Sequence, residues 1–251
     1  MKDVDKVLFD SKNLAQLDAS IVPQHVAIIP DGNRRWATRE VLANDPTGHR
    51  HGAHNVLDIV EAAGNMGIKT LTLYTFSTEN WSRPSAEVDL LIDLIESYLK
   101  DQRERMIQEG VKLGIIGDIS RLPPSVQQTI HITKEATQHC ETINLVLAIN
   151  YGARDELCRV MRTILQETQS DGLDPKNIDE RFIAKHLDTE PWGDPALLIR
   201  TSGEMRISNF LLWQLSYTEL YVTDTLWPDF TPDHLLKAIL DYQRRERRNG
   251  A

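Results

Sequence analysis

Two arginines, two serines and a glycine occur close together between Arg200 and Ser208. The planar guanidinium groups of Arg200 and Arg206 can each offer a fork of donors to phosphate oxygens. Ser202, Ser208 and the backbone N–H groups around Gly203 can satisfy the remaining acceptors. An apolar run of Phe, Leu and Trp follows directly. The cluster predicts a site that holds a diphosphate beside an apolar interior, whereas either arginine taken alone would be an ordinary solvated residue.

A carboxylate, a flexible glycine and several donors stand together near the N-terminus, in the run from Pro30 to Trp36. Asp31 can hold Mg²⁺, and Gly32 lets the backbone approach a phosphate closely. A helix that starts here would aim its N–H groups at the anion. Asp-Gly-Asn is also a common turn sequence, so these residues alone support a diphosphate site and a plain turn about equally.

A histidine follows in the motif Gly48-His49, ahead of a predicted helix. His49 can hydrogen-bond a phosphate or donate a proton to a departing one. A lone histidine is more often structural, and that interpretation leads for His49 taken alone.

Polar and aromatic side chains also follow an apolar run that ends at Phe76. Ser77, Asn80 and Arg83 can contact a polar ligand, and Trp81 can wall off a hydrophobic substrate. The same stretch is typical of a Ser/Thr-rich helix cap with a proline near the first turn. Both interpretations hold together, because a cap requires neither Arg83 nor Trp81.

The elements that must position these motifs alternate along the chain between short apolar runs and helical patterns. Six runs predict strands, at His25–Ile29, Thr70–Phe76, Val111–Ile116, Ile143–Ile149, Ala196–Ile199 and Glu219–Val222. Four segments have the spacing of helices, at Ala53–Asn65, Glu87–Gln108, Pro124–His139 and Asp155–Glu167. The succession predicts an α/β fold with a central, mostly parallel six-stranded sheet flanked by helices. Ligands bind near the carboxyl ends of such strands, where the polar motifs stand.

We expect a single domain over residues 21–251, after an N-terminal arm at residues 1–20 that has no chemical role. The length of 251 residues, with 41% hydrophobic and 26% charged residues, suits one large globular domain. The C-terminal helix ends in a basic run at residues 244–248. We interpret this run as a solvated helix end rather than a membrane or partner contact.

Charge and cysteine content exclude several classes of function. A formal net charge of -9 argues against a nucleic-acid partner. Cys140 and Cys158 are the only cysteines and lack metal-ligand spacing, so a disulfide framework or zinc site is not expected. The chain starts without an apolar leader and contains no run long enough to span a bilayer. We expect a cytoplasmic protein, with at most a peripheral contact at the inner face of the membrane for product release.

Taken together, the motifs resemble the cis-prenyltransferase family, the Z-isoprenyl diphosphate synthases, of which undecaprenyl diphosphate synthase is the common bacterial member. The resemblance covers nearly all of residues 24–230. It rests on Asp-Gly-Asn-x-Arg-Trp-Ala from Asp31, Gly48-His49, Ser-Thr-Glu-Asn-Trp-Ser-Arg-Pro from Ser77, and Arg-Thr-Ser-Gly-Glu-x-Arg-x-Ser-Asn-Phe-Leu-Leu-Trp-Gln from Arg200. It also includes Asn150-Tyr-Gly, Glu219 and Trp227-Pro-Asp-Phe.

The resemblance implies condensation of an allylic diphosphate, typically farnesyl diphosphate, with successive isopentenyl diphosphate units, each new double bond being cis. It assigns Asp31 to Mg²⁺ and the allylic diphosphate, and Arg200, Arg206 and Ser208 to isopentenyl diphosphate. Glu219, from the same site or from the neighbouring subunit of a homodimer, would help to bind Mg²⁺. The other residues that it places at the substrates are Gly32, Asn33, Arg34, Arg35, Trp36, His49, Ser77, Thr78, Glu79, Trp81, Arg83 and Ile207.

The proton acceptor implied by the resemblance is Asn80, with Ser77 nearby. Asparagine is a poor base in water, so a released diphosphate oxygen can take the proton instead, with Asn80 orienting it. Mg²⁺ and arginines would stabilise the leaving group while an apolar wall shields the allylic cation.

The growing product requires a hydrophobic tunnel, which we place between the second strand and the helices at Ala53–Asn65 and Glu87–Gln108. Thr75, where the family opens the tunnel with small residues, is compatible with a medium or shortened chain. No long insertion follows the predicted helix that begins at Glu87, which argues against very long products. Long products should leave slowly, and detergent or lipid should then stimulate turnover.

The chain departs from the family pattern between Ala37 and Gly48, where an arginine usually helps to hold the allylic diphosphate. Asn44-Asp45-Pro46-Thr47 stands there instead, and Arg39 or Arg50 is the available replacement. The product length is therefore left open between an undecaprenyl chain and a short chain. Two other classes are a non-catalytic accessory subunit, which would have lost Asp31, and a Mg²⁺-dependent phosphohydrolase.

Overall fold

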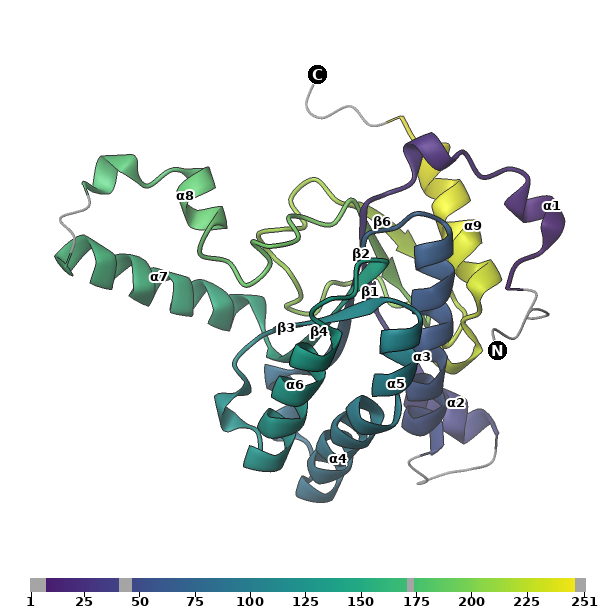
Figure 1. The fold of residues 1–251 in the computed structure, drawn as a ribbon, viewed down its shortest axis with the longest axis horizontal. Coiled ribbons are helices and arrows are strands. Elements are labelled where there is room, and N and C mark those ends of the chain that lie inside the picture. The colour runs from purple at the N-terminus through teal and green to yellow at the C-terminus, as the bar shows by residue number, and fades with distance from the viewer. Residues whose placement is uncertain (1–7, 41–46, 171–173, 247–251) are drawn as a thin grey trace.

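Six parallel strands form one sheet at the centre of the molecule (Figure 1). The computed structural model describes residues 8–40, 47–170 and 174–246. The strands are β1 (His25–Ile29), β2 (Thr70–Ser77), β3 (Val111–Ile116), β4 (Ile143–Tyr151), β5 (Leu197–Arg200) and β6 (Glu219–Val222). Their order is β3-β4-β2-β1-β5-β6, and every pair is parallel. The predicted α/β fold is confirmed.

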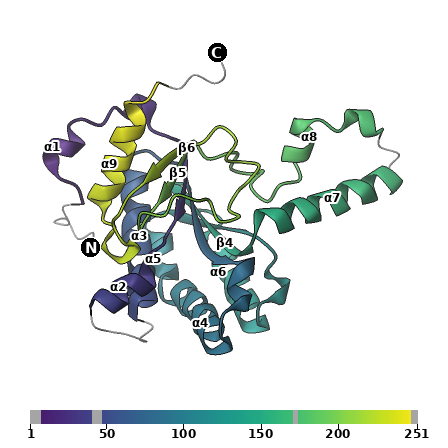
Figure 2. The same ribbon diagram turned by 180° about the vertical axis from the view of Figure 1, so that it is seen from behind.

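Helices cover one face of this sheet, and loop residues such as Phe210 and Leu211 pack on the other (Figures 1 and 2). The α-helices of the described residues are α1 (Ser11–Leu14), α2 (Asn33–Arg39), α3 (Thr47–Asn65), α4 (Ser85–Asp101), α5 (Arg103–Gln108), α6 (Pro124–Thr137), α7 (Ala153–Ser170), α8 (Glu180–Ala184) and α9 (Pro232–Gln243). Short 3₁₀ helices include η2 (Thr78–Ser82) and η5 (Trp227–Asp229). None of the helices in the described ranges is long and apolar enough to cross a bilayer.

One predicted helix is wrong as a single element. The segment Glu87–Gln108 forms two helices, α4 and α5, which meet at Gln102 with φ -97° and ψ -1°. The turn buries Met106 in the core and brings Arg105 to the acidic side chains of α3. Apolar periodicity continues through the break, so the sequence pattern alone did not show it.

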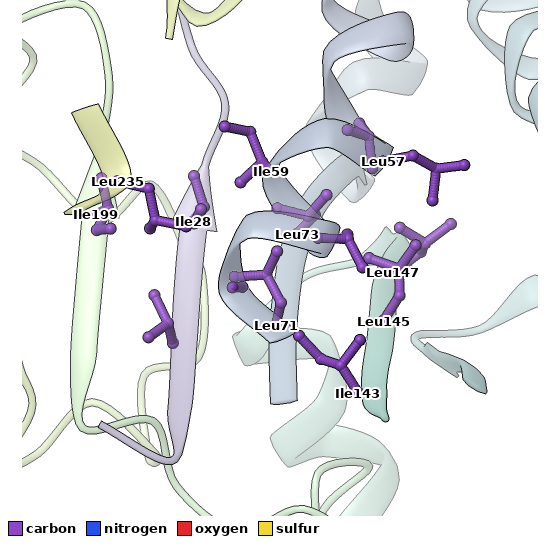
Figure 3. Packing of buried hydrophobic residues seen from close by; sticks show 14 of the residues in the cluster. Ile28, Leu57, Ile59, Leu71, Leu73, Ile143, Leu145, Leu147, Ile199 and Leu235 are labelled. Atoms are coloured by element: carbon purple, nitrogen blue, oxygen red, sulfur yellow. The ribbon is translucent and has the colours of Figure 1, made fainter. Parts of the chain in front are cut away.

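The main core lies between the sheet and the layer formed by α3, α4, α6 and α9. Figure 3 shows side chains of four adjacent strands, such as Leu73 and Leu147, meeting Leu57 and Ile59 of α3. All five residues of β1 are buried, because helices or loops cover both faces of this central strand. A second cluster on the other face includes Phe210.

The helices α7 and α8 project away from the sheet, as both views show (Figures 1 and 2). A small apolar cluster of Val160, Ile164 and Leu187 holds them together. Met161 and Leu165 of α7 are nevertheless 59% and 56% exposed. None of the residues that the structure describes covers this apolar part of α7.

The N-terminal segment that precedes β1 lies along α9 (Figure 1). The N–H of Asp10 donates to Asp233 at 2.7 Å, and Gln243 donates to the carbonyl of Asp18 at 2.7 Å. Phe9 packs against the main core. The described part of the predicted arm thus contacts α9 of the domain.

Strand register brings the polar motifs to one edge of the sheet. Ile29 lies opposite Arg200, and Ser77 lies opposite Tyr151. The strands β2, β3 and β4 lie on one side of β1, and β5 and β6 lie on the other, so the order in which strands are added to the sheet changes direction at β1. A reversal of this kind opens a crevice beyond the carboxyl ends of the strands.

Candidate active site

A cavity of about 920 Å³ opens at this point, beyond β1, β2 and β5. Its polar part is lined by residues of all four predicted motifs. The predicted site residues that line the cavity are Asp31, Gly32, Asn33, Arg34, Arg35, His49, Ser77, Glu79, Asn80, Arg83, Arg200, Arg206 and Ser208. The fold therefore brings most of the candidate residues into one pocket.

Arg200 is the residue that connects the first motif to the last. Its side chain is only 6% exposed. One Nη group donates to Asp31 Oδ2 at 2.9 Å, and the other donates to Ser208 Oγ at 2.8 Å and to the carbonyl of Arg206. Its Nε has no partner among the described residues. A buried guanidinium held on both sides gives the pocket a fixed positive charge.

Asp31 stands at the end of β1 with its carboxylate directed into this charged region. Its backbone N–H donates to Thr201 Oγ1 at 2.7 Å, and its Oδ1 accepts the N–H of Gly32 at 2.7 Å. Burial raises the pKa of Asp31, but the hydrogen bond and charge of Arg200 outweigh burial and hold the pKa below its usual range. Asp31 is therefore ionised near neutral pH.

Gly32 starts α2 with φ 107°, a left-handed conformation that a side chain would strain. A Cβ there would lie 2.8 Å from Leu226. The turn that the sequence suggested is present, and it delivers Asp31 to the pocket. A turn and a site are compatible at this position, and binding of a diphosphate here stays a prediction.

Arg35 anchors the loop that follows β5. It donates to the carbonyl of Ser202 at 2.9 Å and to Ser202 Oγ at 2.5 Å, and it lies 3.4 Å from Glu204. Arg206 forms an ion pair with Glu204 and is 62% exposed. An exposed guanidinium on a surface ion pair gains little from that pair, so Arg206 can turn toward an anionic ligand at small cost.

The loop from Ser202 to Leu211 contains an unusual number of left-handed backbone conformations. Ser202, Ser208, Asn209 and Leu211 all have φ between 47° and 75°. Such conformations cost energy in non-glycine residues and persist where packing enforces them. The complete burial of Leu211 supplies that packing here.

The second-strand motif forms a cap and also lines the pocket. The N–H of Ser77 donates to Asn80 Oδ1 at 2.9 Å, completing a capping box at η2. Arg83 pairs with Glu87 at 2.8 Å. Because Asn80 Oδ1 already accepts a backbone N–H, its geometry favours an orienting role over that of a proton acceptor.

His49 is partly buried at the mouth of this pocket. Burial lowers its pKa, and the nearby charge of Arg83 lowers it further. The imidazole is therefore neutral near pH 7, which suits a hydrogen-bonding role better than that of a permanent cation.

Four of the predicted contact residues do not line the cavity, namely Trp36, Thr78, Trp81 and Ile207. Trp36 donates to Asp229 at 2.8 Å and packs on His51. Trp81 donates to Asn150 at 2.8 Å and packs edge-to-face on Phe76. The N–H group of each indole donates to an acceptor outside the pocket, and each ring packs against another aromatic side chain.

Glu219 does not join Asp31 within one chain, so the same-site prediction is wrong. Glu219 is the first residue of β6 and lies opposite Leu197, whereas Asp31 follows the far end of β1. Strand rise places the two about 15 Å apart along the strands alone. Glu219 instead pairs with Arg245 at 2.7 Å. The neighbouring-subunit alternative stays a prediction.

The apolar part of the cavity runs between the sheet and the helices α3 and α4. Its lining residues are Ala53, Val56, Leu73, Thr75, Leu91, Leu94, Ile95, Tyr98 and Leu147. This agrees with the predicted tunnel walls at β2, α3 and α4. The part of the prediction that became α5 contributes none of these lining residues.

Three residues of the site were missed by sequence reasoning. Tyr74 stacks on Phe210 and donates to the carbonyl of Tyr151 at 3.2 Å. Asn209 donates to Glu79 at 2.7 Å and caps α7 through its carbonyl. Thr201 holds the backbone of Asp31. Asn209 and Thr201 lie inside the predicted motif that starts at Arg200, and this position in the sequence could have identified them as site residues.

The stretch Asn44 to Pro46, where the usual arginine is missing, lies outside the described residues. Arg39 pairs with Asp229 at 2.9 Å and does not line the cavity. Arg50 is exposed and does not line it either. Neither proposed replacement therefore reaches the pocket in this structure.

The donor set can hold a Mg²⁺ ion only with help from a ligand. No group of three or more His, Cys, Asp or Glu side chains that could bind a metal occurs within residues 8–40, 47–170 and 174–246. Asp31 is ionised and partly exposed in the pocket. Mg²⁺ commonly takes one or two carboxylates and completes its shell with phosphate oxygens and water, so the site fits.

The fold and this pocket are typical of a class of enzyme that binds diphosphate esters. The diphosphate lies at the carboxyl ends of parallel strands, and the hydrocarbon part lies in an apolar cavity next to the sheet. The chain belongs to the prenyltransferase family of undecaprenyl diphosphate synthases, whose model matches residues 29–250. The predicted family is confirmed, and the protein is a prenyltransferase. Metal dependence is general in this family.

Relatives named isoprenyl transferase come from several bacteria. That of Prochlorococcus marinus is 48% identical over 94% of this chain and 86% of its own length. That of Chlamydia trachomatis is 46% identical over 95% of both chains.

Two solved structures share the fold. Lavandulyl diphosphate synthase from Lavandula x intermedia, in complex with dimethylallyl diphosphate, has a TM-score of 0.89 and 37% identity, over 92% of this chain and 100% of that one. A probable undecaprenyl diphosphate synthase from Campylobacter jejuni has a TM-score of 0.77 and 33% identity, over 91% and 99%.

Proposed function

We propose that this protein condenses farnesyl diphosphate with successive isopentenyl diphosphate units in cis, to give a polyprenyl diphosphate of undecaprenyl length. In a bacterium such a product serves as carrier lipid for cell-wall synthesis. The observation that supports this most is the junction of Asp31, Arg200 and Ser208, which opens directly into an apolar cavity. Diphosphate groups fit the junction, and isoprenoid chains fit the cavity.

The site separates the charges that the reaction creates. Departure of the allylic diphosphate leaves negative charge on oxygen and an allylic cation on carbon. Arg200 and Arg206 stabilise phosphate oxygens, and the apolar wall shields the cation from water. The new carbon–carbon bond forms at that cation, and a diphosphate oxygen oriented by Asn80 accepts the displaced proton.

Asp31 is the residue that would hold Mg²⁺, together with Gly32, Asn33 and Arg35 around the allylic diphosphate. The ion, when bound, neutralises charge on the departing diphosphate. Asp31 supplies a carboxylate whose low pKa keeps it available across the neutral range.

A short-chain product is the second candidate. It is favoured by the similarity to lavandulyl diphosphate synthase, whose structure contains dimethylallyl diphosphate. Retention of Asp31, Asn80 and Arg200 weighs against a non-catalytic subunit. The extended apolar wall weighs against a phosphohydrolase.

The protein would act as a homodimer that uses the exposed edge of the sheet. Leu220 and Val222 project from the edge strand β6 and are 52% and 38% exposed. An exposed apolar edge strand is a ready surface for pairing. Such a dimer would also place Glu219 in an interface, as the neighbouring-subunit prediction requires.

The test is incubation of the purified protein with Mg²⁺, labelled isopentenyl diphosphate and, separately, dimethylallyl, geranyl and farnesyl diphosphates, followed by chain-length analysis. We expect a polyprenyl ladder that ends near undecaprenyl with farnesyl diphosphate. Asp31→Ala should abolish it, because Mg²⁺ and Arg200 both lose their carboxylate partner. Asp89→Ala, an exposed residue of α4 outside the pocket, is the matched control.

A short product would favour the second candidate. Phosphate release from simple esters without carbon–carbon bond formation would favour a hydrolase. No product with any primer would leave the accessory subunit as the better function.

A further inference from the structure

A register shift near the end of β4 leaves Asn150 as an extra residue in the strand. Phe76 of β2 lies opposite Ile149, and the next residue of β2, Ser77, lies opposite Tyr151. Asn150 has a left-handed backbone, with φ 47°, and is only 6% exposed. Irregularities of this kind occur often beside active sites, where they redirect a side chain.

The side-chain amide of Asn150 joins two loops. Its Nδ2 donates to the carbonyl of Asp118, which follows β3, at 2.6 Å. Its Oδ1 accepts the indole N–H of Trp81 at 2.8 Å. Because the buried amide uses a donor at one end and an acceptor at the other, its orientation is fixed, and so is the place of the indole N–H.

The ring of Trp81 is held by two further contacts. Phe76 packs on it edge-to-face, with ring centroids 5.2 Å apart. The guanidinium of Arg121 lies over the ring, 4.1 Å from its centroid. Arg121 ends the short 3₁₀ turn that follows Asp118. The loop after β3 therefore contacts Trp81 directly and also through Asn150.

Trp81 belongs to η2, the turn that presents two residues to the pocket. Asn80 precedes it and Arg83 follows two residues later, and both line the cavity. The carbonyl of Asn80 accepts the N–H of Arg83 at 3.1 Å. Trp81 and Asn150 stand outside the lining of the cavity that the described residues form. A 3₁₀ turn of this length is compact, so fixing the indole also fixes where its neighbours point.

We propose that Asn150 is a positioning residue, which holds Asn80 and Arg83 in place through Trp81. The inference rests on the proposed function, in which Asn80 orients the diphosphate oxygen that accepts the proton. A small displacement of an orienting group lowers the rate of the chemical step much more than it weakens substrate binding. Loss of the Asn150 amide should therefore slow condensation without a matching change in substrate affinity.

The experiment measures the first condensation alone, so that slow release of a long product does not mask the chemical step. Enzyme in excess over farnesyl diphosphate reacts with labelled isopentenyl diphosphate at several concentrations, in the presence of Mg²⁺. The readouts are the single-turnover rate constant and the isopentenyl diphosphate concentration that gives half of it. The variants are Asn150→Gly, Trp81→Phe and the double variant.

Asn150→Gly keeps the left-handed backbone at no steric cost and removes the amide. We expect its rate constant to fall about tenfold or more, with less than about a threefold change in the half-saturating concentration. Trp81→Phe keeps a ring against Phe76 but removes the N–H donor, and its rate constant should fall in the same way. Because both variants break one connection, the double variant should be little slower than the slower single variant.

Asn144→Gly is the matched control. Asn144 lies in the same strand, and its side chain likewise connects β4 to the chain beside β2, through a bond of 3.0 Å to the carbonyl of Lys69. It does not line the cavity. The control loses a comparable hydrogen bond in the same sheet, and its rate constant should equal that of the wild type.

Circular dichroism melting curves show which variants fold. If Asn150→Gly does not fold, Trp81→Phe decides the question, and an unchanged rate constant in that variant would overturn the inference.

A wild-type rate constant in Asn150→Gly would overturn the inference and leave the proposed function intact. A change confined to the half-saturating concentration, an equal loss of rate in Asn144→Gly, or a double variant slowed by the product of the two single effects would do the same. Absence of product from the wild-type protein would instead refute the proposed function and the inference with it.

Discussion

Arg200 shows how a single side chain can assemble a site from distant parts of the sequence. It donates hydrogen bonds to Asp31 after β1 at 2.9 Å and to Ser208 after β5 at 2.8 Å. A lysine could not make these contacts together, because an ammonium group lacks the planar fork. The motif around Arg200 was recognisable from residue types because phosphate binding restricts which side chains can serve.

Residue types were less informative for the two tryptophans. Trp36 and Trp81 stand beside polar motifs, which suggested contact with substrate. Each indole has one N–H donor, and in the fold these donors reach Asp229 and Asn150. Which acceptor an indole finds depends on tertiary neighbours, so the sequence could not decide the direction of either ring.

His25 provides a test of stability against pH. It is buried in β1, where its Nδ1–H donates to the carbonyl of Gly193 and its Nε2 accepts from Thr72. Burial lowers its pKa to about 4, although the Gly193 hydrogen bond opposes the shift. The unfolded chain binds this proton near pH 6.5, so stability is complete above that pH and is lost as the pH falls toward 4.

The loss from His25 should amount to roughly 3 kcal/mol. The measurement is the free energy of unfolding in urea at several pH values between about 7.5 and 4.5. His25→Gln should be less stable at neutral pH, yet its stability should fall less steeply below pH 6.5 than that of the wild type. Parallel curves for the two proteins would contradict the prediction.

At the scale of elements, the strands were predictable and the helix boundaries less so. Apolar runs marked all six strands because helices or loops bury most of them on both faces. The break between α4 and α5 left no proline or glycine in the sequence, and Gln102 alone marks it. The break lets α5 pack against α6 and β3, and such tertiary contacts are not contained in a local sequence pattern.

A buried polar network connects β4, α7 and the loop that follows β5. Glu156 is fully buried and accepts from the Tyr151 hydroxyl at 2.7 Å, from Gln214 at 3.1 Å and from the N–H of Asp188 at 2.9 Å. Burial raises the pKa of Glu156. Tyr151 in turn packs edge-to-face on Phe210 of the loop from Ser202 to Leu211. The network therefore supports the site from behind.

Removing this support should destabilise the protein. Glu156→Ala leaves three buried donors without an acceptor, and we expect a loss of about 2 to 4 kcal/mol in the free energy of unfolding. Glu156→Gln should lose less, because the amide can donate to Gln214 Oε1, which has no partner among the described residues. Chemical denaturation measures both, with exposed Glu141→Ala as control. Equal effects of the two Glu156 variants would show that the hydrogen bonds are unimportant.

At the scale of the whole molecule, the exposed apolar side chains of β6 lead to a prediction about assembly. Leu220→Asp places a charge in the proposed interface, and we expect it to convert a dimer into a monomer and to lower prenyltransferase activity. Light scattering coupled to size-exclusion chromatography measures the mass. Leu14→Asp, a similarly exposed leucine on α1, should remain dimeric. A wild-type protein that is monomeric at micromolar concentration would contradict this proposal.

The central position of β1 has a consequence for how the molecule is made. β1 pairs with β2 on one side and with β5 on the other, and Asp31 and Arg200 are 169 residues apart in sequence. As the chain leaves the ribosome, one edge of β1 stays open until residues 197–200 have been synthesised and docked. Long-range pairing of this kind forms late in folding. The contact between Asp31 and Arg200, which joins the two halves of the candidate site, is therefore made near the end of synthesis.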